Sequence, residues 1–207
     1  MGQPQGPDER YWQERFERGE MGWDRGEASP QLLRWLSEGS LQPCRILVPG
    51  CGQGWEVVEL AARGFDVLAV DLTVDACDRV WRRLAERGLR ATVVQADVLA
   101  FMPDRPVDAV YEQTCLCALH PRHWRPYADR VRDWLRDGGT LHALFMQAAR
   151  PETASRGEVL GPPYHCDMNA MLALFPPDRW TWPAPPYLAV PHPRGWHELA
   201  VSLRRRD

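Results

Sequence analysis

Residues 46–73 constrain the fold more than any other part of the chain. The apolar run ILVP leads into a glycine-rich turn, GCGQG (residues 50–54), an amphipathic segment follows, and a second apolar run ends at Asp71. This change of period from strand to helix and back is typical of two parallel strands joined by a helix. Because glycine has no side chain, the turn leaves the backbone open to a ligand at the carboxyl edge of the sheet.

The same alternation continues along the chain. From Arg45 onward the predicted strands are RILVP, FDVLAV, ATVVQ, VDAVYE and TLHALFM, and the predicted helices are QGWEVVELAARG, VDACDRVWRRLAERG and PYADRVRDWLRDGG. Near the end, PPYLAVP and GWHELAVSLR predict an antiparallel hairpin. We therefore expect an α/β fold: a doubly wound, mostly parallel seven-stranded sheet with helices on both faces and an antiparallel C-terminal hairpin.

Two short helices are predicted before this core. Residues 8–19 place aromatic side chains at helical spacing and end at Gly19, which suits a C-cap. Further on, Ser29 and Pro30 are typical of an N-cap and of the first position of a second helix.

Acids at the ends of two predicted strands indicate a ligand that contains adenosine. Asp71 comes about 20 residues after the glycine turn, where doubly wound sheets place a carboxylate that accepts hydrogen bonds from ribose hydroxyls. Asp97 ends the next strand and could accept a hydrogen bond from the adenine amino group, while Val98 packs on the ring. The turn reads G-x-G-x-G rather than G-x-G-x-x-G, which matches a pyrophosphate site imperfectly. The alternative is that the glycines only form a tight turn.

Composition limits the domain organisation and the class of partner. The chain has 207 residues, of which 44% are hydrophobic and 26% charged, and it contains no internal repeat or convincing linker. We expect a single domain over residues 1–207, with a helical lid over 1–40 and a Rossmann-like core over 45–207. A formal net charge of -3 leaves no basic surface for nucleic acid.

The cellular location is predicted from what the sequence lacks. The N-terminus has no apolar segment typical of a signal peptide, and no run of about 18 apolar residues predicts a membrane span. We expect a cytoplasmic protein without membrane contact. The six cysteines lie mostly in apolar surroundings and lack the C-x-x-C spacing of structural zinc sites, so we expect them to be reduced and packed.

Three motifs share a pattern with one protein family. YWQERFERGEMGWDRGEASP contains a tryptophan helix, a W-D-x-G loop and an S/T-P pair. VPGCGQG is a V-P-G-C-G-x-G turn, and LGPPY contains a G-P-P-Y loop. These motifs resemble those of the S-adenosylmethionine-dependent class I methyltransferases, in which the G-P-P-Y loop lies near the substrate. The resemblance is closer to the thiopurine methyltransferase-like superfamily, on its halide and thiol (thiocyanate) methyltransferase branch, and it covers nearly the whole chain.

The resemblance implies S-adenosyl-L-methionine as the cofactor and assigns residues to each part of it. Tryptophans would cover the methionine end and the methyl group, glycines would pass beneath, and strand-end residues would hold the ribose, the adenine and the methionine portion. In that order the implied cofactor-binding residues are Trp12, Trp23, Gly50, Gly52, Asp71 with Leu72, Asp97 with Val98, and Glu112. The expected catalytic residues are Trp23, Tyr164 and Glu112, of which Trp23 and Tyr164 would form walls around the transferred methyl group.

The sequence departs from the family pattern after the fourth predicted strand. Glu112 stands where the family has an aspartate, and Gln113 replaces a tyrosine. The next residues, Thr114-Cys115-Leu116, are smaller than the aromatic run often found there. A smaller wall indicates a larger pocket for the methyl acceptor.

Other groups of reactive side chains have simpler explanations. Cys115, Cys117, His120 and His123 could hold a soft metal, but the two histidines follow a proline-marked bend, so we expect no metal site. His165, beside the G-P-P-Y loop, is a further candidate near the methyl acceptor. Two loop arginines, Arg150 and Arg156, could attract an anionic substrate, although solvated arginines are the commoner finding.

The expected function is enzymatic methyl transfer to a small soft nucleophile. Thiols, sulfide, halides, thiocyanate, thiopurines and chalcogen anions belong to this class. In-line transfer from a sulfonium to an anion annihilates charge, so a dry aromatic site lowers the barrier with little acid-base machinery. Two alternatives stay open: an O- or N-methyltransferase for a small metabolite, and a non-catalytic domain that binds S-adenosylmethionine. We expect a monomer whose partner is a small molecule.

Overall fold

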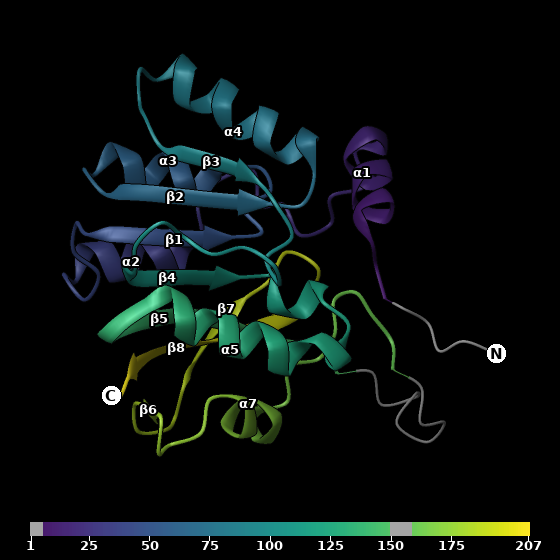
Figure 1. The fold of residues 1–207 in the computed structure, drawn as a ribbon. Coiled ribbons are helices and arrows are strands. Elements are labelled where there is room, and N and C mark those ends of the chain that lie inside the picture. The colour runs from purple at the N-terminus through teal and green to yellow at the C-terminus, as the bar shows by residue number, and fades with distance from the viewer. Residues whose placement is uncertain (1–5, 150–158) are drawn as a thin grey trace.

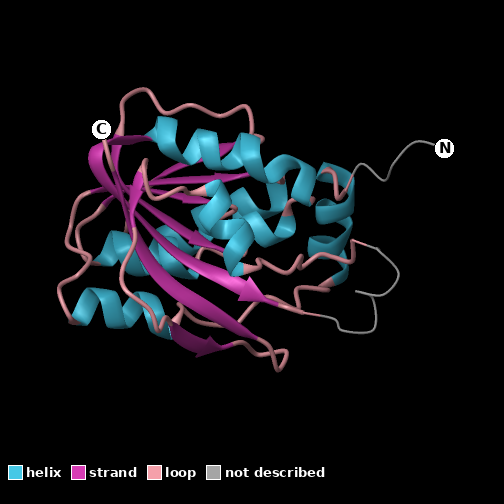
Figure 2. Ribbon diagram, turned by 90° about the horizontal axis from the view of Figure 1, so that it is seen from below, coloured by secondary structure: helices cyan, strands magenta, loops and turns pink. Residues whose placement is uncertain are grey.

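A mixed β-sheet with helices on both faces forms the body of the protein (Figures 1 and 2). The computed structural model describes residues 6–149 and 159–207. Its strands are β1 (Arg45–Pro49), β2 (Asp66–Asp71), β3 (Thr92–Gln95), β4 (Val107–Gln113), β5 (Leu135–Gln147), β6 (Trp180–Thr181), β7 (Leu188–Pro191) and β8 (His197–Arg205). Its helices are α1 (Glu9–Arg18), α2 (Pro30–Ser37), α3 (Trp55–Ala62), α4 (Val74–Glu86), α5 (Trp124–Trp134) and α7 (Met168–Leu174), with short 3-10 turns η1 (Leu116–Ala118) and η2 (Pro121–His123).

The strand order confirms the predicted topology. The sheet reads β3-β2-β1-β4-β5-β8-β6, with β7 also paired to β8. Neighbouring strands from β3 to β5 are parallel, and β8 is antiparallel to β5, β6 and β7. Within the described ranges the sheet has eight strands rather than the predicted seven. The additional strand, β6, is two residues long, which is too short to show an alternating pattern in the sequence.

Two hydrophobic clusters lie on the two faces of the sheet. Strand residues alternate between them, so Leu47 belongs to one cluster and its neighbour Val48 to the other. Helices α2, α3 and α4 cover the face of Val48, where Val80 is fully buried. Helix α5 covers the opposite face and buries Tyr127 and Trp134 completely. The helices packed on both faces of the sheet therefore hold its carboxyl edge rigidly in place.

Helix α1 lies at this carboxyl edge, where the arrows of β1 to β4 end in Figure 1. Asp8 caps its start by accepting a hydrogen bond from the Tyr11 N–H at 2.9 Å, and Gly19 ends it in the left-handed conformation, as predicted. Helix α2 begins at Pro30 as predicted, but the Ser29 side chain makes no capping hydrogen bond. No helix within the described ranges is long and apolar enough to cross a membrane.

The packing of the glycine turn against the core can be tested at Gly54. This residue precedes α3 with φ +76°, and a Cβ added there would lie 2.7 Å from Val80 Cγ2. At Gly64, which has φ +84°, an added Cβ would meet nothing within 4 Å. We expect Gly54→Ala to lower the free energy of unfolding by about 1 to 3 kcal/mol more than Gly64→Ala, because only Gly54→Ala overpacks the core. Urea denaturation measures both, and equal losses would contradict this packing.

Candidate active site

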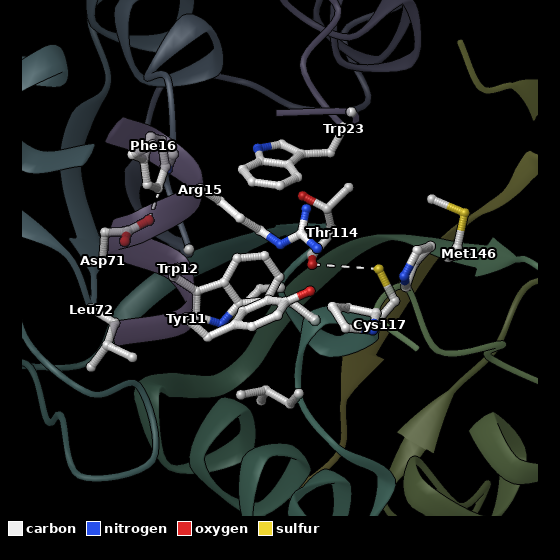
Figure 3. A pocket seen from close by; sticks show the side chains of 18 of the residues that line it. Tyr11, Trp12, Arg15, Phe16, Trp23, Asp71, Leu72, Thr114, Cys117 and Met146 are labelled. Carbon is white, nitrogen blue, oxygen red and sulfur yellow. Dashed lines mark hydrogen bonds between the residues drawn. The ribbon is translucent and has the colours of Figure 1, made fainter. Parts of the chain in front are cut away.

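A pocket of about 170 Å³ opens between α1 and the carboxyl ends of the parallel strands (Figure 3). Eight of the nine predicted cofactor-binding residues line it: Trp12, Trp23, Gly50, Gly52, Asp71, Leu72, Asp97 and Val98. These residues come from α1, the following loop and the ends of β1, β2 and β3. The exception among the nine is Glu112. Residues from the N-terminal 40 and from the sheet thus form one concave site.

The glycine turn is fastened to the end of β2 by Asp71. Its Oδ2 atom accepts a hydrogen bond from the Gly52 N–H at 2.9 Å, and its Oδ1 atom accepts two from the backbone and hydroxyl of Thr73 at 3.0 Å each. Burial raises the pKa of the Asp71 carboxyl, while these donors from Thr73 and Gly52 act in the opposite direction. Since a carboxylate oxygen has two lone pairs, Oδ2 keeps the capacity to accept one more hydrogen bond.

Aromatic side chains cover the glycine turn. The ring centroids of Trp12 and Trp23 are 5.5 Å apart in an edge-to-face arrangement, and those of Phe16 and Trp23 are 5.9 Å apart. A Cβ added to Gly52 would lie 3.8 Å from the Trp23 Nε1 atom, so the indole lies directly over the turn. Aromatic faces attract cations, and a sulfonium is a cation. The aromatic cover fits the sulfonium of the predicted cofactor, and the Asp71 carboxylate fits its ribose.

Two long-range contacts hold the loop that carries Trp23. Asp24 accepts a hydrogen bond from the Trp55 indole N–H at 2.9 Å. Arg25 donates to the Glu198 carboxylate at 3.0 Å, an ion pair in which the Glu198 side chain is fully buried. Moving the loop away would separate the pair and leave the Glu198 charge buried without compensation, which is strongly unfavourable. The Arg25 and Glu198 pair therefore fixes the loop against β8.

Gln113, the departure from the family pattern, belongs to the same network. Its amide donates to both Glu198 oxygens, at 3.0 and 3.3 Å, and its oxygen accepts a hydrogen bond from the Tyr111 hydroxyl at 2.7 Å. The end of β4 is thereby connected to the Trp23 loop through Glu198. Sequence analysis identified Gln113 only as an unusual residue, because its partner is 85 residues away.

Glu112 lies outside the pocket wall. Its Oε2 atom accepts a hydrogen bond from the Tyr127 hydroxyl at 2.6 Å, and its Oε1 atom accepts one from the Leu116 N–H at 3.0 Å. Burial raises the pKa of Glu112 to about 7. The carboxyl group therefore holds the turn between β4 and η1 against α5.

The G-P-P-Y loop contributes its prolines to the pocket rather than its tyrosine. Pro162 and Pro163 line the wall, whereas Tyr164 and His165 are not among the lining residues. Tyr164 is buried, donates its backbone N–H to the Cys117 carbonyl at 2.7 Å, and packs edge-to-face against His120. The structure thus gives Tyr164 a packing position beside the site.

The turn between β7 and β8 forms the pocket wall on the antiparallel side of the sheet. No sequence motif indicated that this turn reaches the site. His192, Arg194 and Trp196 line the pocket there. His192 Nδ1 accepts a hydrogen bond from the Arg194 N–H at 3.3 Å, and its ring stacks on Trp196. Burial, with the nearby Arg25 and Arg194, lowers the pKa of His192 to about 4. The imidazole is neutral at pH 7, and its Nδ1 is already occupied.

Cysteines on the wall remain thiols. Cys115 and Cys117 both line the pocket, and burial raises the pKa of each well above its ordinary value. Across residues 6–149 and 159–207, no three His, Cys, Asp or Glu side chains gather as metal ligands. The loop arginines Arg150 and Arg156 lie outside the described residues.

The fold and this pocket together define a class I S-adenosylmethionine-dependent methyltransferase. The strand order is that of a doubly wound sheet, and the glycine turn, the strand-end carboxylates and the aromatic cover line one pocket at its carboxyl edge. The family model described as Thiopurine S-methyltransferase (TPMT) matches residues 7–181, so the chain belongs to that family. The predicted family, enzyme class and cofactor are confirmed.

Curated relatives span most of the chain. Thiopurine S-methyltransferase of Pseudomonas fluorescens (strain SBW25) is 30% identical over 183 residues, covering 80% of this chain and 81% of the relative. Probable thiol methyltransferase 2 of Arabidopsis thaliana is 28% identical over 160 residues, or 76% of this chain and 68% of the relative. Thiocyanate methyltransferase 1 of Brassica oleracea is 28% identical over 163 residues, or 78% of this chain and 69% of the relative.

Solved structures share the fold. The 1,6-didemethyltoxoflavin-N1-methyltransferase of Burkholderia thailandensis, determined with bound 1,6-didemethyltoxoflavin and S-adenosylhomocysteine, has a TM-score of 0.76 and 21% identity, covering 100% of this chain and 94% of its own. The N-methyltransferase NodS of Bradyrhizobium japonicum WM9, with S-adenosylhomocysteine, has a TM-score of 0.67 and 22% identity, covering 93% and 88%. Likeness at this level of identity establishes the architecture.

Asp71→Asn tests the ribose assignment. The amide preserves the shape of the side chain but replaces one acceptor oxygen with an NH₂ group. We expect S-adenosylhomocysteine to bind the variant more weakly by about 1 to 3 kcal/mol in calorimetry, because the ribose hydroxyls lose their acceptor. Asp66→Asn, at the exposed start of the same strand, is the control and should bind as the wild type does. Equal affinities in all three proteins would remove Asp71 from the site.

The buried Glu198 predicts a pH dependence of stability. Burial outweighs the attraction of Arg25 and raises its pKa from 4.5 to about 7. The folded state therefore retains a proton that the unfolded chain releases, so this contribution to stability is complete below about pH 4.5 and is lost as the pH rises through about 7. In the wild type, this group makes the free energy of unfolding fall as the pH rises from about 5 to about 8. We expect Glu198→Gln to reduce that fall by at most about 3 kcal/mol. Urea titrations at each pH give this slope, and parallel curves for the two proteins would refute the shift.

Proposed function

We propose that the protein transfers the methyl group of S-adenosylmethionine to a small, soft, anionic nucleophile, with thiolates as the first candidates. The carrying observation is the composition of the pocket wall, which combines the sulfur-containing side chains of Cys117 and Met146 with Trp196 and Arg194. Polarisable and cationic groups suit a soft anion. The names of the relatives, which include thiol, thiocyanate and thiopurine methyltransferases, support the same class of methyl acceptor.

The imidazole in the pocket wall is a poor general base, which favours a nucleophile that arrives ionised. His192 is the imidazole in the wall, and its Nδ1 atom already accepts the Arg194 N–H. The other nitrogen of a neutral imidazole then carries the proton and cannot remove one from a substrate. A free thiol has a pKa of about 8.5 and is a few per cent ionised near pH 7, so it needs little help.

The cofactor, when bound, supplies a sulfonium methyl group as the electrophile. Trp12 and Trp23 would then face the positive charge and exclude water from it, which raises the reactivity of an anion that has lost its hydration shell. Positioning by the rigid turn and lid supplies a further part of the acceleration, since well-oriented reactants gain about 7 to 11 kcal/mol.

The residue roles follow from these positions. Asp71 with Leu72, and Asp97 with Val98, would hold the adenosine as predicted. For Glu112 we propose a positioning role through Tyr127 and the β4–η1 turn, because its buried carboxyl group bonds to Tyr127 and Leu116 and is not part of the pocket lining. Tyr164 would support the proline wall from behind rather than contact the nucleophile.

We also propose that residues 1–207 act as one monomeric, cytoplasmic domain with a small molecule as its partner. Support comes from the site itself, whose lining residues belong to both the lid of residues 1–40 and the core of 45–207 within a single chain. A second copy is not needed to complete the pocket. The net charge of -3 supports the proposal that nucleic acid is not a partner.

A substrate panel tests this function. Purified protein is incubated with labelled S-adenosylmethionine and, in separate reactions, with iodide, thiocyanate, hydrosulfide, thiophenol, a thiopurine, phenol or a primary amine. We expect methylation of one or more soft anions and none of phenol or the amine, because their proton would need a base. Methylation confined to phenol or the amine would favour the O- or N-methyltransferase alternative. Cofactor binding without turnover of any substrate would favour a binding domain.

A further inference from the structure

Arg15 is a charged residue within an aromatic lid. It lies on α1 between the lid residues Trp12 and Phe16, and it lines the pocket with them. In Figure 3 its guanidinium extends into the space between Trp23 and Tyr11, close to Thr114. No sequence motif assigns a role to this arginine, because helical spacing alone does not distinguish a pocket arginine from a solvated one.

The contacts of Arg15 within the protein are weak. Its Cζ atom lies 4.6 Å from the centroid of the Tyr11 ring, and its Nη1 atom lies 3.6 Å from Glu20 Oε2. The side chains of this ion pair are 35% and 53% exposed. Exposed ion pairs contribute about 0 to 1 kcal/mol, so the guanidinium can turn to a better partner at little cost.

The two strand-end acids of the pocket lie apart from the Arg15 guanidinium, whose acidic neighbour in the wall is the exposed Glu20. Asp71 and Asp97 stand at the ends of β2 and β3, the end that fits the adenosine. In Figure 3, Asp71 and Leu72 lie on one side of Trp12, and the Arg15 guanidinium lies toward the opposite side. A ligand held at its nucleoside by the two acids would extend its other end toward the arginine.

The chemistry of the cofactor matches this division. S-adenosylmethionine carries one carboxylate, at the methionine end and remote from the nucleoside. A guanidinium recognises a carboxylate by paired, charge-assisted hydrogen bonds, which are stronger than neutral ones. An arginine without an anion in this position would repel the sulfonium, and pairing with the carboxylate offsets that repulsion.

We propose that Arg15 binds the α-carboxylate of the cofactor's methionine portion and so closes α1 over the bound cofactor. This assignment rests on the cofactor of the family and is independent of the identity of the methyl acceptor. Arg15 is then a binding residue of the lid, and its substitution lowers the affinity for ligands that contain the amino-acid portion.

Two ligands that differ in this portion separate the proposal from a structural role. S-adenosylhomocysteine contains the carboxylate, whereas 5′-methylthioadenosine has the same nucleoside and sulfur without it. Calorimetric titrations of both into the wild type and Arg15→Gln measure the contribution of the carboxylate contact. We expect Arg15→Gln to bind S-adenosylhomocysteine roughly 10- to 100-fold more weakly. Its affinity for 5′-methylthioadenosine should stay within about two-fold of the wild type.

Arg18→Gln is the matched control. Arg18 lies on the same helix, its side chain is 64% exposed, and its partner is Glu14 rather than a pocket residue. We expect this variant to bind both ligands as the wild type does, and Arg15→Lys to recover part of the lost affinity.

Three results would overturn the proposal. An equal loss of affinity for both ligands in Arg15→Gln would show that the residue only supports the lid. Unchanged affinity for S-adenosylhomocysteine would remove the carboxylate contact. Unchanged affinity combined with slower turnover of anionic nucleophiles would place Arg15 at the methyl acceptor instead. Failure of the substrate panel with wild-type protein would affect the proposed function but leave these titrations fully interpretable.

Discussion

The hydrogen bond between the Gly52 N–H and the Asp71 carboxylate is the contact on which the site depends. It joins the turn after β1 to the end of β2, the two strands whose ends form the floor of the pocket. Thr73 holds the other carboxylate oxygen, so the acid is fixed before any ligand arrives. Preorganisation of this kind lowers the free-energy cost of binding, because little motion is lost when the ligand enters.

The lid requires contacts from distant parts of the chain. Arg25 pairs with Glu198 across 173 residues of sequence, and the Trp55 indole donates to Asp24 from the start of α3. These bonds hold Trp23 above the glycine turn, while α1 packs beside α4. A rigid floor and a separately fastened lid together exclude water from the reacting atoms, which suits a reaction between a cation and an anion.

Local patterns predicted all strands except β6, the helices α1 to α5 and the glycine turn, because each arises from the period and turn residues of a short segment. The strand-end acids could also be placed, since parallel strands end at one edge of the sheet. Glu112 shows the limit: its position in the motif indicated a cofactor contact, but burial against Tyr127 directs it away from the pocket wall. The wall at His192 was missed for a related reason, because a turn between two C-terminal strands reaches the site only through the pairing of β8 with β5.

A crystal structure of the protein grown with S-adenosylhomocysteine would test the central claim most directly. We expect the ribose hydroxyls within hydrogen-bond distance of Asp71, the adenine beside Asp97 and Val98, and the sulfur atom beneath the Trp12 and Trp23 rings. Nucleoside density elsewhere on the protein, or an Asp71 carboxylate that bonds only to Gly52 and Thr73 while the ligand is bound, would contradict the assignment of this pocket as the cofactor site.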